Sequence, residues 1–368
     1  MAFGYKGGMD VMQFIRHTQD YVCLSPIFTE LEQLYAELSD PKKKRVGLFQ
    51  PLYDNRFVPI VKLFTYMTDY DFSYIGFTDK HFDKVTLPSF NSKNIIVCYS
   101  GGKDSLAAIR HYQKCGYNVF AYHIKGLNKT YCDEWEVTEK VCDKLGVPLY
   151  IDSVSYSGNH VWVEHPMKNM LMALMALTWG VRNSISIKIA VGSFRTAFTT
   201  DNAFEVCGGD CMDMWKLFED VVNAIIPSFQ MYIPNRNFHT AYNLLLKEQE
   251  LLPLTISCMT PNRFRGLFRK RTLQKYHVDL MPYRCGCCWK CATEYIWFCD
   301  HNVLDYDRDY YIHCLEILAD TLKKETRVYI YRVEDVWSNY FFYSMRKSKA
   351  YKELKDAIIR SGKIKVAR

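Results

Sequence analysis

The sequence lacks any run of about 18 apolar residues, the length that marks a membrane-spanning helix, although 49% of its 368 residues are hydrophobic. We therefore expect no membrane span and no membrane partner. The first ten residues, MAFGYKGGMD, also lack the apolar core of a secretory signal peptide. Together these two absences predict a cytoplasmic protein.

We also expect no disulfide framework, although the sequence contains 14 cysteines. The cytosol keeps thiols reduced, so cysteines of a cytoplasmic protein rarely pair. Metal binding is the better explanation for any cysteines that cluster in the sequence.

The chain is organised around the stretch from Asn94 to Gly116. Its β-branched run Ile95–Val97 is typical of a buried parallel strand. The segment Ser100–Ser105, SGGKDS, then breaks the strand with two glycines, and Lys103 opens a helix that ends at Gly116. The segment is not a Walker A loop, because that loop has four residues between its first glycine and its Gly-Lys pair.

The residue types of this turn suit phosphate binding. Glycines let backbone N–H groups approach an anion closely, and a helix start adds roughly half a positive charge. Ser100 and Ser105 can donate hydroxyl hydrogen bonds, and Lys103 supplies a positive charge. Asp104 repels phosphate, so its presence indicates Mg²⁺ between carboxylate and phosphate. The alternative is an ordinary connection between a strand and a helix.

The chain after this turn alternates between predicted strands and helices. The expected strands are Tyr117–Ile124, Pro148–Val154, Ile187–Val191 and Phe229–Ile233, and the expected helices are Cys132–Leu145, Pro166–Trp179, Met212–Ile226 and Thr240–Leu251. This alternation predicts an α/β fold with a doubly wound parallel sheet, in which ligands bind beyond the carboxyl ends of the strands.

Residues 1–92 precede this pattern and are predicted to form an extra N-terminal subdomain, for substrate capture or dimerisation. We expect helices at Asp10–His17 and Phe28–Leu38, strands with short helices over Tyr53–Lys84, and a linker at Leu87–Ser92. The basic segment Pro41–Val46 resembles a nuclear-localisation signal, but short basic clusters occur often by chance and a solvated turn is the favoured interpretation.

Four cysteines lie within one seven-residue segment near position 288. Cys285, Cys288 and Cys291 form two overlapping C-x-x-C steps, which can present three thiolates to one ion. A closed tetrahedral zinc site needs a fourth ligand, and Cys258 is the best candidate. Cys287 is an alternative ligand that the spacing disfavours. The pattern predicts structural Zn²⁺, with an iron–sulfur cluster as the alternative.

The SGGKDS segment resembles the PP-loop of the N-type ATP pyrophosphatases, which cleave ATP between the α and β phosphates and adenylate a substrate oxygen. Together with the later pattern Ser-Cys…Cys-Gly-x-Cys-x-x-Cys, it resembles the 7-cyano-7-deazaguanine (preQ0) synthases of queuosine biosynthesis over about residues 94–300. This resemblance implies a Rossmann-like fold, a structural Zn²⁺ ion and Mg²⁺ bound with ATP. It also implies a C–N ligase that activates a 7-carboxy-7-deazaguanine carboxylate, which ammonia converts to an amide and then a nitrile.

The same resemblance implies roles for individual residues. Asp104 is the catalytic acid linked to the metal, and Lys103 clamps phosphate. The implied ATP-binding set is Tyr99, Ser100, Gly101, Gly102, Lys103, Asp104, Ser105, Leu106 and His123. Gly192 and Asp210 are expected at the deazapurine substrate, and Cys258, Cys285, Cys288 and Cys291 at the metal. The implied domains are residues 1–92, 93–257, 258–300 and 301–368.

The sequence departs from this family where the substrate would be recognised. The segment between Cys258 and Cys285 is much longer than in the family, and its only acid is Asp279. It carries seven cationic residues, Arg263, Arg265, Arg269, Lys270, Arg271, Lys275 and Arg284. Residues 301–368 form a basic and aromatic extension, and the whole chain has a formal net charge of +7. Such regions suit a nucleic acid or a solvated surface.

Three alternative functions remain open at this point. One is a divergent relative that stops at the amide or transfers a deazaguanine to a protein or a nucleic acid, which the basic regions favour weakly. Another is a tRNA thiolase or PAPS-reductase-like enzyme that uses the cysteines for sulfur or iron chemistry. The last is a non-catalytic scaffold that binds a nucleotide. A homodimer is expected as one possible assembly.

Overall fold

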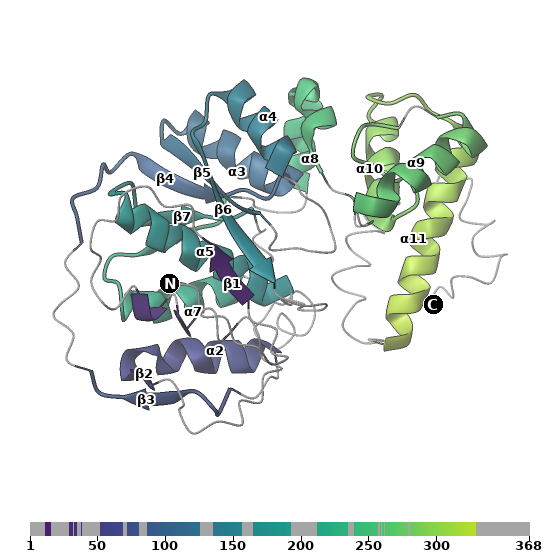
Figure 1. The fold of residues 1–368 in the computed structure, drawn as a ribbon. Coiled ribbons are helices and arrows are strands. Elements are labelled where there is room, and N and C mark those ends of the chain that lie inside the picture. The colour runs from purple at the N-terminus through teal and green to yellow at the C-terminus, as the bar shows by residue number, and fades with distance from the viewer. Residues whose placement is uncertain are drawn as a thin grey trace. The chain divides into compact units, whose positions relative to one another are not determined.

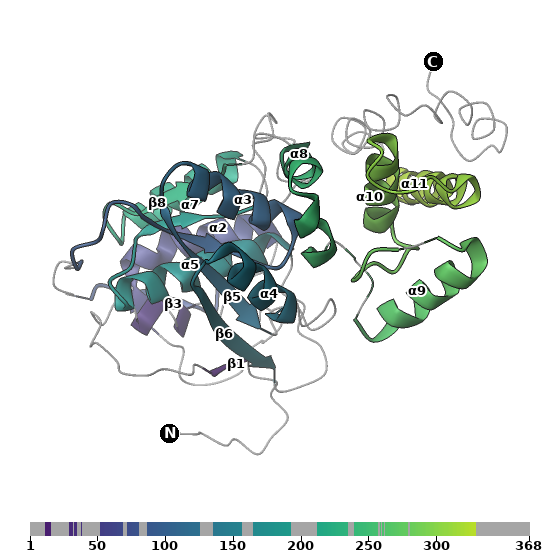
Figure 2. The same ribbon diagram turned by 90° about the horizontal axis from the view of Figure 1, so that it is seen from above.

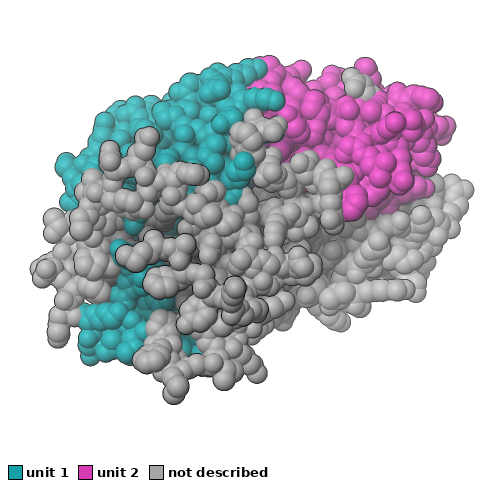
Figure 3. Space-filling model, in the orientation of Figure 1, with its two compact units in different colours: residues 1–100, 104–129, 134–237 teal, residues 101–103, 130–133, 238–368 magenta. Residues whose placement is uncertain are grey.

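The computed structural model describes residues 12–15, 29–31, 33–34, 38, 52–68, 72–80, 87–125, 135–156, 165–192, 212–234, 239–256, 258, 260, 262–278 and 280–328. The chain divides into two compact units (Figure 3). Unit 1 comprises residues 1–100, 104–129 and 134–237, and unit 2 comprises residues 101–103, 130–133 and 238–368. The basic segment Pro41–Val46 and the extension after Val328 lie outside the described residues.

Unit 1 is built on a six-stranded sheet with the order β1-β6-β5-β4-β7-β8. The strands are β1 (Met12–Ile15), β4 (Asn94–Cys98), β5 (Asn118–Lys125), β6 (Leu149–Tyr156), β7 (Lys188–Ala190) and β8 (Gln230–Tyr232). The last five are parallel, which confirms the predicted α/β fold. The chain adds β5 and β6 on one side of β4, and β7 and β8 on the other. A topological switch point therefore lies at the carboxyl ends of β4 and β7.

Helices cover both faces of this sheet (Figure 1). The helices α3 (Lys103–Lys114) and α4 (Trp135–Leu145) lie on one face, and α5 (His165–Arg182) and α7 (Met212–Asn223) on the other. A further helix, α2 (Val58–Thr68), packs against α5 and α7. Because α5 lies between the sheet and α2, every residue from Met170 to Leu177 is buried. The apolar sequence of this helix is thus explained by burial on all sides.

The N-terminal part of the chain shares the hydrophobic core of the sheet. Its strands β2 (Leu52–Asp54) and β3 (Gly76–Thr78) pair in parallel around η1 (Asn55–Phe57) and α2, as the expected mixture of strands and short helices requires. Phe57 belongs to the same buried cluster as Trp215 of α7. Residues 29–31, 33–34 and 38 are helical, within the predicted Phe28–Leu38 helix.

The predicted helix at Asp10–His17 is wrong. Met12–Ile15 forms β1, which pairs antiparallel with β6, so that Met12 lies opposite Tyr156 and Ile15 opposite Ser153. A short segment with a few apolar residues carries too little periodicity to distinguish a helix from a strand. The N–H and C=O groups along the outer edge of β6 need hydrogen-bond partners. Met12–Ile15 therefore forms a strand, because pairing with β6 supplies those partners.

Unit 2 consists of helices within the described residues. They are α8 (His239–Lys247), η3 (Gln249–Leu254), α9 (Asn262–Tyr276), α10 (Trp289–Asp300) and α11 (Arg308–Val328). Helices α10 and α11 pack on each other through a core that includes Tyr295, Tyr310 and Leu315. In the part of the chain that the structure describes, none of the helices has the length and apolar character needed to span a membrane.

Gly180 marks a place where helix α5 touches its surroundings too closely for a side chain. A Cβ atom at this position would lie 2.4 Å from Ile96 Cδ1 and 2.4 Å from the backbone oxygen of Ser186. We expect Gly180→Ala to lower the free energy of unfolding by about 1–3 kcal/mol, because the backbone at Ser186 must move. Denaturant titration followed by circular dichroism measures this change.

The matched control is Gly266→Ala in helix α9. No atom lies within 4 Å of the Cβ position at Gly266. This variant should be neutral or more stable by up to about 1 kcal/mol, because alanine favours a helix. A Gly180→Ala protein as stable as the wild type would contradict the packing described for α5.

Candidate functional site

The predicted strand, glycine turn and helix are present at residues 94–114. Strand β4 ends at Cys98, and α3 begins at Lys103. Gly101 has a φ of +80°, in the left-handed region that favours glycine. The turn is closed by a 3.4 Å hydrogen bond in which Ser100 N–H donates to Ser105 Oγ. The N–H groups that begin α3 therefore follow directly from the carboxyl end of a central strand, which is a favourable place for an anion.

Gly192 lies against the start of α3, two residues after β7 ends. A Cβ atom on Gly192 would lie 2.5 Å from Ser105 N and 2.7 Å from the carbonyl carbon of Asp104. Both neighbours are backbone atoms, so they cannot move aside as a flexible side chain would. The position requires glycine, because two backbones approach each other closely there. The structure thus brings Gly192, predicted at the substrate, together with two residues predicted at ATP.

His123, in β5, supports the residue that follows β4. Its Nδ1 atom lies 2.9 Å from the carbonyl oxygen of Tyr99. A carbonyl can only accept, so Nδ1 carries the hydrogen of this bond. Tyr99, Leu106 and His123 are all buried, whereas Ser100, Gly102 and Asp104 are partly exposed. The residues predicted to bind ATP therefore form two groups. One group is buried and supports the turn, and the other is partly exposed on it.

Within unit 2, the ammonium group of Lys103 lies over an aromatic ring. Its Nζ atom is 4.9 Å from the ring centroid of Tyr242 in α8, within the range of a cation–π interaction. Both side chains are buried, which strengthens the attraction. The ring of Tyr242 packs in turn on Trp297 and Phe298 of α10, at centroid distances of 5.3 and 5.8 Å. No local sequence pattern links Tyr242 to Lys103, so this contact could not be predicted from the sequence.

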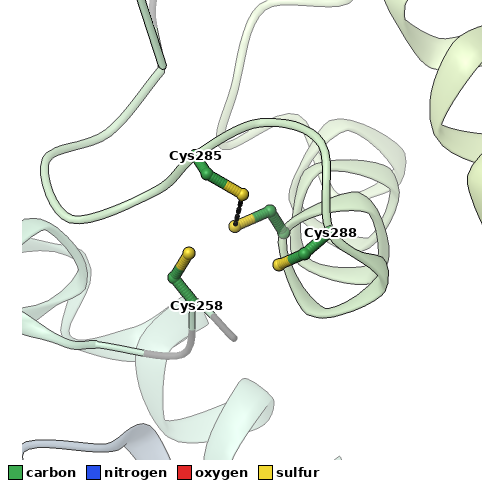
Figure 4. Close-up of side chains that lie close together, drawn as sticks. Cys258, Cys285 and Cys288 are labelled. Atoms are coloured by element: carbon green, nitrogen blue, oxygen red, sulfur yellow. Dashed lines mark hydrogen bonds between the residues drawn. The ribbon is translucent and has the colours of Figure 1, made fainter. Parts of the chain in front are cut away.

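Four cysteine thiols converge in unit 2 (Figure 4). The Sγ atoms of Cys258, Cys285, Cys288 and Cys291 all lie within 4.8 Å of one another, and those of Cys285 and Cys291 are 3.9 Å apart. Thiolates around one tetrahedral zinc ion, with Zn–S bonds of about 2.3 Å, lie about 3.8 Å apart. The cluster can therefore hold a single metal ion such as zinc. The four predicted ligands come together, and Cys287 is exposed.

The loop that carries Cys285 is shaped by close contacts with α9 and α11. Gly286 has a φ of +76°, and a Cβ atom on it would lie 2.8 Å from Thr272 Cγ2 of α9. Thr272 also donates its hydroxyl hydrogen to the Cys285 carbonyl at 3.3 Å. Tyr310 of α11 donates a 2.8 Å hydrogen bond to the Gly286 carbonyl. Glycine thus lets the loop turn tightly, while neighbouring side chains fix its carbonyl groups.

A buried ion pair connects this loop to the segment before Cys258. Arg284 and Glu294 are 2% and 1% exposed, and Arg284 Nε donates to Glu294 Oε2 at 2.8 Å. Arg284 also donates to the Thr255 carbonyl, and to Thr255 Oγ1 at 2.9 Å. These extra bonds offset the cost of burying the charges. The sequence analysis counted Arg284 with the basic segment, but it is buried and paired.

The same segment reaches the glycine turn. Ile256 N–H donates a 3.0 Å hydrogen bond to the carbonyl oxygen of Gly101, and both residues belong to unit 2. Thr255 and Ile256 are buried, as is Cys258 two residues later. A short piece of chain therefore joins a metal ligand to the residue with left-handed backbone in the turn.

The clustered thiols change one another's acidity. Hydrogen bonds from the thiols around it, that of Cys258 first, hold the pKa of Cys285 well below its usual range. Contact with Cys258 and Cys285 raises the pKa values of Cys288 and Cys291. The Cys285 thiol acts in the opposite direction, but hydrogen bonds from Cys288 and Cys291 lower the pKa of Cys258 to about 6. Negative charge therefore concentrates on Cys258 and Cys285, and the protons remain on Cys288 and Cys291. A metal ion must displace protons from the remaining ligands, so its affinity falls as the pH falls.

Comparison of the chain with protein-family models and with curated proteins finds no match. Asp210, predicted at the substrate, lies outside the described residues. The turn at Ser100–Ser105 and the four-cysteine cluster are thus the two features on which a functional proposal rests.

We expect the purified protein to contain one zinc ion per chain. Cys285→Ser and Cys291→Ser should each lose it, because three thiolates no longer close the tetrahedron. Cys287→Ser is the matched control and should keep the metal, since Cys287 lies next to the cluster but is exposed. Elemental analysis together with a sulfide assay measures the result.

The outcomes of this metal analysis are distinct. Detection of iron together with acid-labile sulfide would show that the cysteines hold an iron–sulfur cluster and not zinc. Equal metal loss from Cys287→Ser and Cys285→Ser would contradict the ligand set. Full-length protein free of metal after zinc addition and desalting would contradict the site itself.

Proposed function

We propose that the protein is an ATP-dependent adenylating enzyme of the PP-loop type, in which Ser100–Ser105 holds the pyrophosphate end of ATP. The observation that carries this proposal is the position of the turn. It leads from the central strand β4 into α3 at the topological switch point of a parallel sheet. Ligands of such sheets bind at this point, and a helix start there favours phosphate.

The chemistry of the turn supports a role in nucleotidyl transfer. Lys103, held over the ring of Tyr242, brings positive charge to the turn and would neutralise the leaving pyrophosphate. Asp104 is partly exposed in the first turn of α3. Its carboxylate suits Mg²⁺, which would bridge it to the phosphates of ATP. This division of roles explains why an acidic residue stands in a turn that suits anions.

The proposed reaction follows from the resemblance to the 7-cyano-7-deazaguanine synthases. A carboxylate oxygen of 7-carboxy-7-deazaguanine attacks the α phosphorus of ATP in line, and the bond to the bridging oxygen breaks, releasing pyrophosphate. Ammonia then attacks the carbonyl carbon of the adenylate, and AMP and a proton leave to give the amide. The amide oxygen attacks a second ATP and releases pyrophosphate, and loss of AMP and the two N–H protons gives the nitrile.

The cysteine cluster supports a structural role for its metal. Four thiolates close a tetrahedral site and leave no position for water or a substrate. Cys285 and Cys291 are buried, so neither presents a thiol to a large substrate. Both features favour the adenylating enzyme over a tRNA thiolase or a PAPS-reductase-like enzyme, which need accessible sulfur or iron. The exposed Cys287 thiol, 3.6 Å from Cys285 Sγ, is the feature that would serve those two alternatives.

Incubation with ATP, Mg²⁺, 7-carboxy-7-deazaguanine and ammonium should yield AMP, pyrophosphate and the nitrile, measured by mass spectrometry. Asp104→Asn should lower the rate by roughly 100-fold or more, because the Mg²⁺ charge is then poorly placed. Asp143→Asn, an exposed aspartate of α4, is the control and should retain full activity.

Each result of this assay has a definite meaning. An amide end product would keep the adenylation chemistry but stop the proposed sequence halfway. AMP formed only after addition of RNA or protein would change the acceptor. Absence of AMP under all these conditions would overturn the proposal, and an unchanged rate in Asp104→Asn would overturn the role of that carboxylate.

Tyr242 provides an independent test of the Lys103 assignment. Tyr242→Leu removes the aromatic face, so we expect KM for ATP to rise about 5- to 30-fold, corresponding to about 1–2 kcal/mol. Tyr242→Phe keeps the ring and should leave KM nearly unchanged. Steady-state kinetics measures both variants, and circular dichroism checks their folding. Equal KM values in the two variants would show that the ring does not position Lys103 for ATP.

A further inference from the structure

Helix α9 carries an unusual charge. Its 15 residues, Asn262–Tyr276, include six cationic residues and no acid. Like charges four positions apart repel each other on a helix, as Arg271 and Lys275 do here. Glu316 of α11 attracts Lys275, and an anionic partner would offset the repulsion among the other exposed cations.

The inner face of α9 is fixed to the cysteine loop. Arg269 donates a hydrogen bond from Nη2 to the Leu280 carbonyl, and Thr272 donates to the Cys285 carbonyl. Phe268 packs against the buried thiols, and Arg265 is 5% exposed. The helix is therefore anchored along one side by residues at intervals of three and four.

The outer face of α9 is exposed and combines cations with apolar groups. Its residues are Phe264, Leu267, Lys270, Arg271, Gln274 and Lys275, of which Phe264 and Leu267 are 40% and 48% exposed. Figure 2 shows α9 at the margin of unit 2, and its last residue, Tyr276, packs on Tyr310 and His313 of α11 at centroid distances of 5.3 and 5.0 Å. We call this set the α9 outer face.

Two of its cations are placed by aromatic rings. The guanidinium carbon of Arg271 lies 6.0 Å from the ring centroid of Phe268, and Lys275 Nζ lies 4.7 Å from that of Tyr276. These contacts restrict where the charges can lie. Phe264 adds an exposed aromatic ring beside them, with its centroid 6.3 Å from that of Phe268.

We infer that the α9 outer face binds single-stranded nucleic acid, with Lys270, Arg271 and Lys275 on phosphates and Phe264 stacked on a base. Positive charge combined with an exposed aromatic ring is how proteins bind single strands without reading their sequence. An anionic membrane is the competing partner. Only two apolar residues project from this face, which is little area for insertion between lipids.

The first test measures fluorescence anisotropy of a labelled 20-nucleotide single-stranded RNA, and of DNA of the same sequence, with full-length protein and no ATP. The variant combines Lys270→Glu, Arg271→Glu and Lys275→Glu. We expect its affinity to fall at least tenfold and the slope of log affinity against log salt to flatten by about 2, because three phosphate contacts are lost.

The matched control combines Lys62→Glu, Lys140→Glu and Lys144→Glu, three exposed lysines of α2 and α4 in unit 1. It changes the net charge by the same amount, so it separates local contacts from overall charge. Its salt slope should equal that of the wild type. Equal losses in the two triple variants, or no loss in the α9 variant, would overturn the inference. Circular dichroism and metal content verify that each variant is folded.

A second pair of variants separates stacking from insertion into lipid. Phe264→Ala should weaken binding of the RNA about 5-fold or more with an unchanged salt slope, whereas Leu267→Ala should have little effect. Sedimentation with phosphatidylcholine–phosphatidylserine vesicles provides the other arm. Binding to vesicles that depends equally on Phe264 and Leu267, with no binding of the oligonucleotides, would show that the partner is a membrane and not a nucleic acid. None of these measurements requires adenylation, so their results are independent of whether the proposed function is correct.

Discussion

The left-handed backbone conformation of Gly101 determines the path of the turn, and the other features of the turn depend on that path. With φ at +80°, the chain leaves β4 and enters α3 within a few residues, so N–H groups of the helix start lie at the carboxyl end of a central strand. Gly192 lacks a side chain because the backbone at Ser105 approaches it within the space of a methyl group. The Gly101 carbonyl is in turn occupied by Ile256 N–H. A side chain at either glycine would alter the geometry of the turn.

The cysteine cluster gives the segment before Cys258 a fixed position that its few residues could not hold alone. Cys258 is the ligand most distant in sequence from the other three, so a bound ion closes a long loop, which removes entropy from the unfolded chain. Arg284 adds hydrogen bonds to both oxygens of Thr255, and Glu294 neutralises its charge. Loss of either partner would leave a buried charge unpaired, at a cost of about 3–5 kcal/mol. A metal ion bound by the cluster would thus act on the same short segment as the ion pair.

Structural features that depend on interactions within a short stretch of sequence were mostly predicted correctly. The β-branched run before SGGKDS, the buried helix around Met170–Leu177 and the C-x-x-C steps of the cysteine cluster all appear as predicted, because each depends on periodicity or spacing within a short stretch. Cys258 was predicted from the need of a tetrahedral site for a fourth thiolate, and it does lie with the other three. The error at Met12–Ile15 arose where a distant strand, β6, supplied the missing hydrogen bonds. The ring of Tyr242 beneath Lys103 and the pairing of Arg284 with Glu294 are contacts between separate elements. No spacing in the sequence encodes them, so only the folded chain reveals them.

Helix α9 shows how the metal loop supports residues that weaken their own helix. A short helix with six cations and no acid is marginal on its own, because its charges repel and little apolar surface drives its formation. The bonds from Thr272 and Arg269 to carbonyl groups of the loop, and the burial of Phe268 among the thiols, supply the missing stability. All of these contacts come from the inner face. On the outer face, Arg271 and Lys275 contact the rings of Phe268 and Tyr276, which belong to the same helix. These contacts leave the repulsion among the outer cations in place, and that repulsion is the reason for proposing a polyanion as the partner.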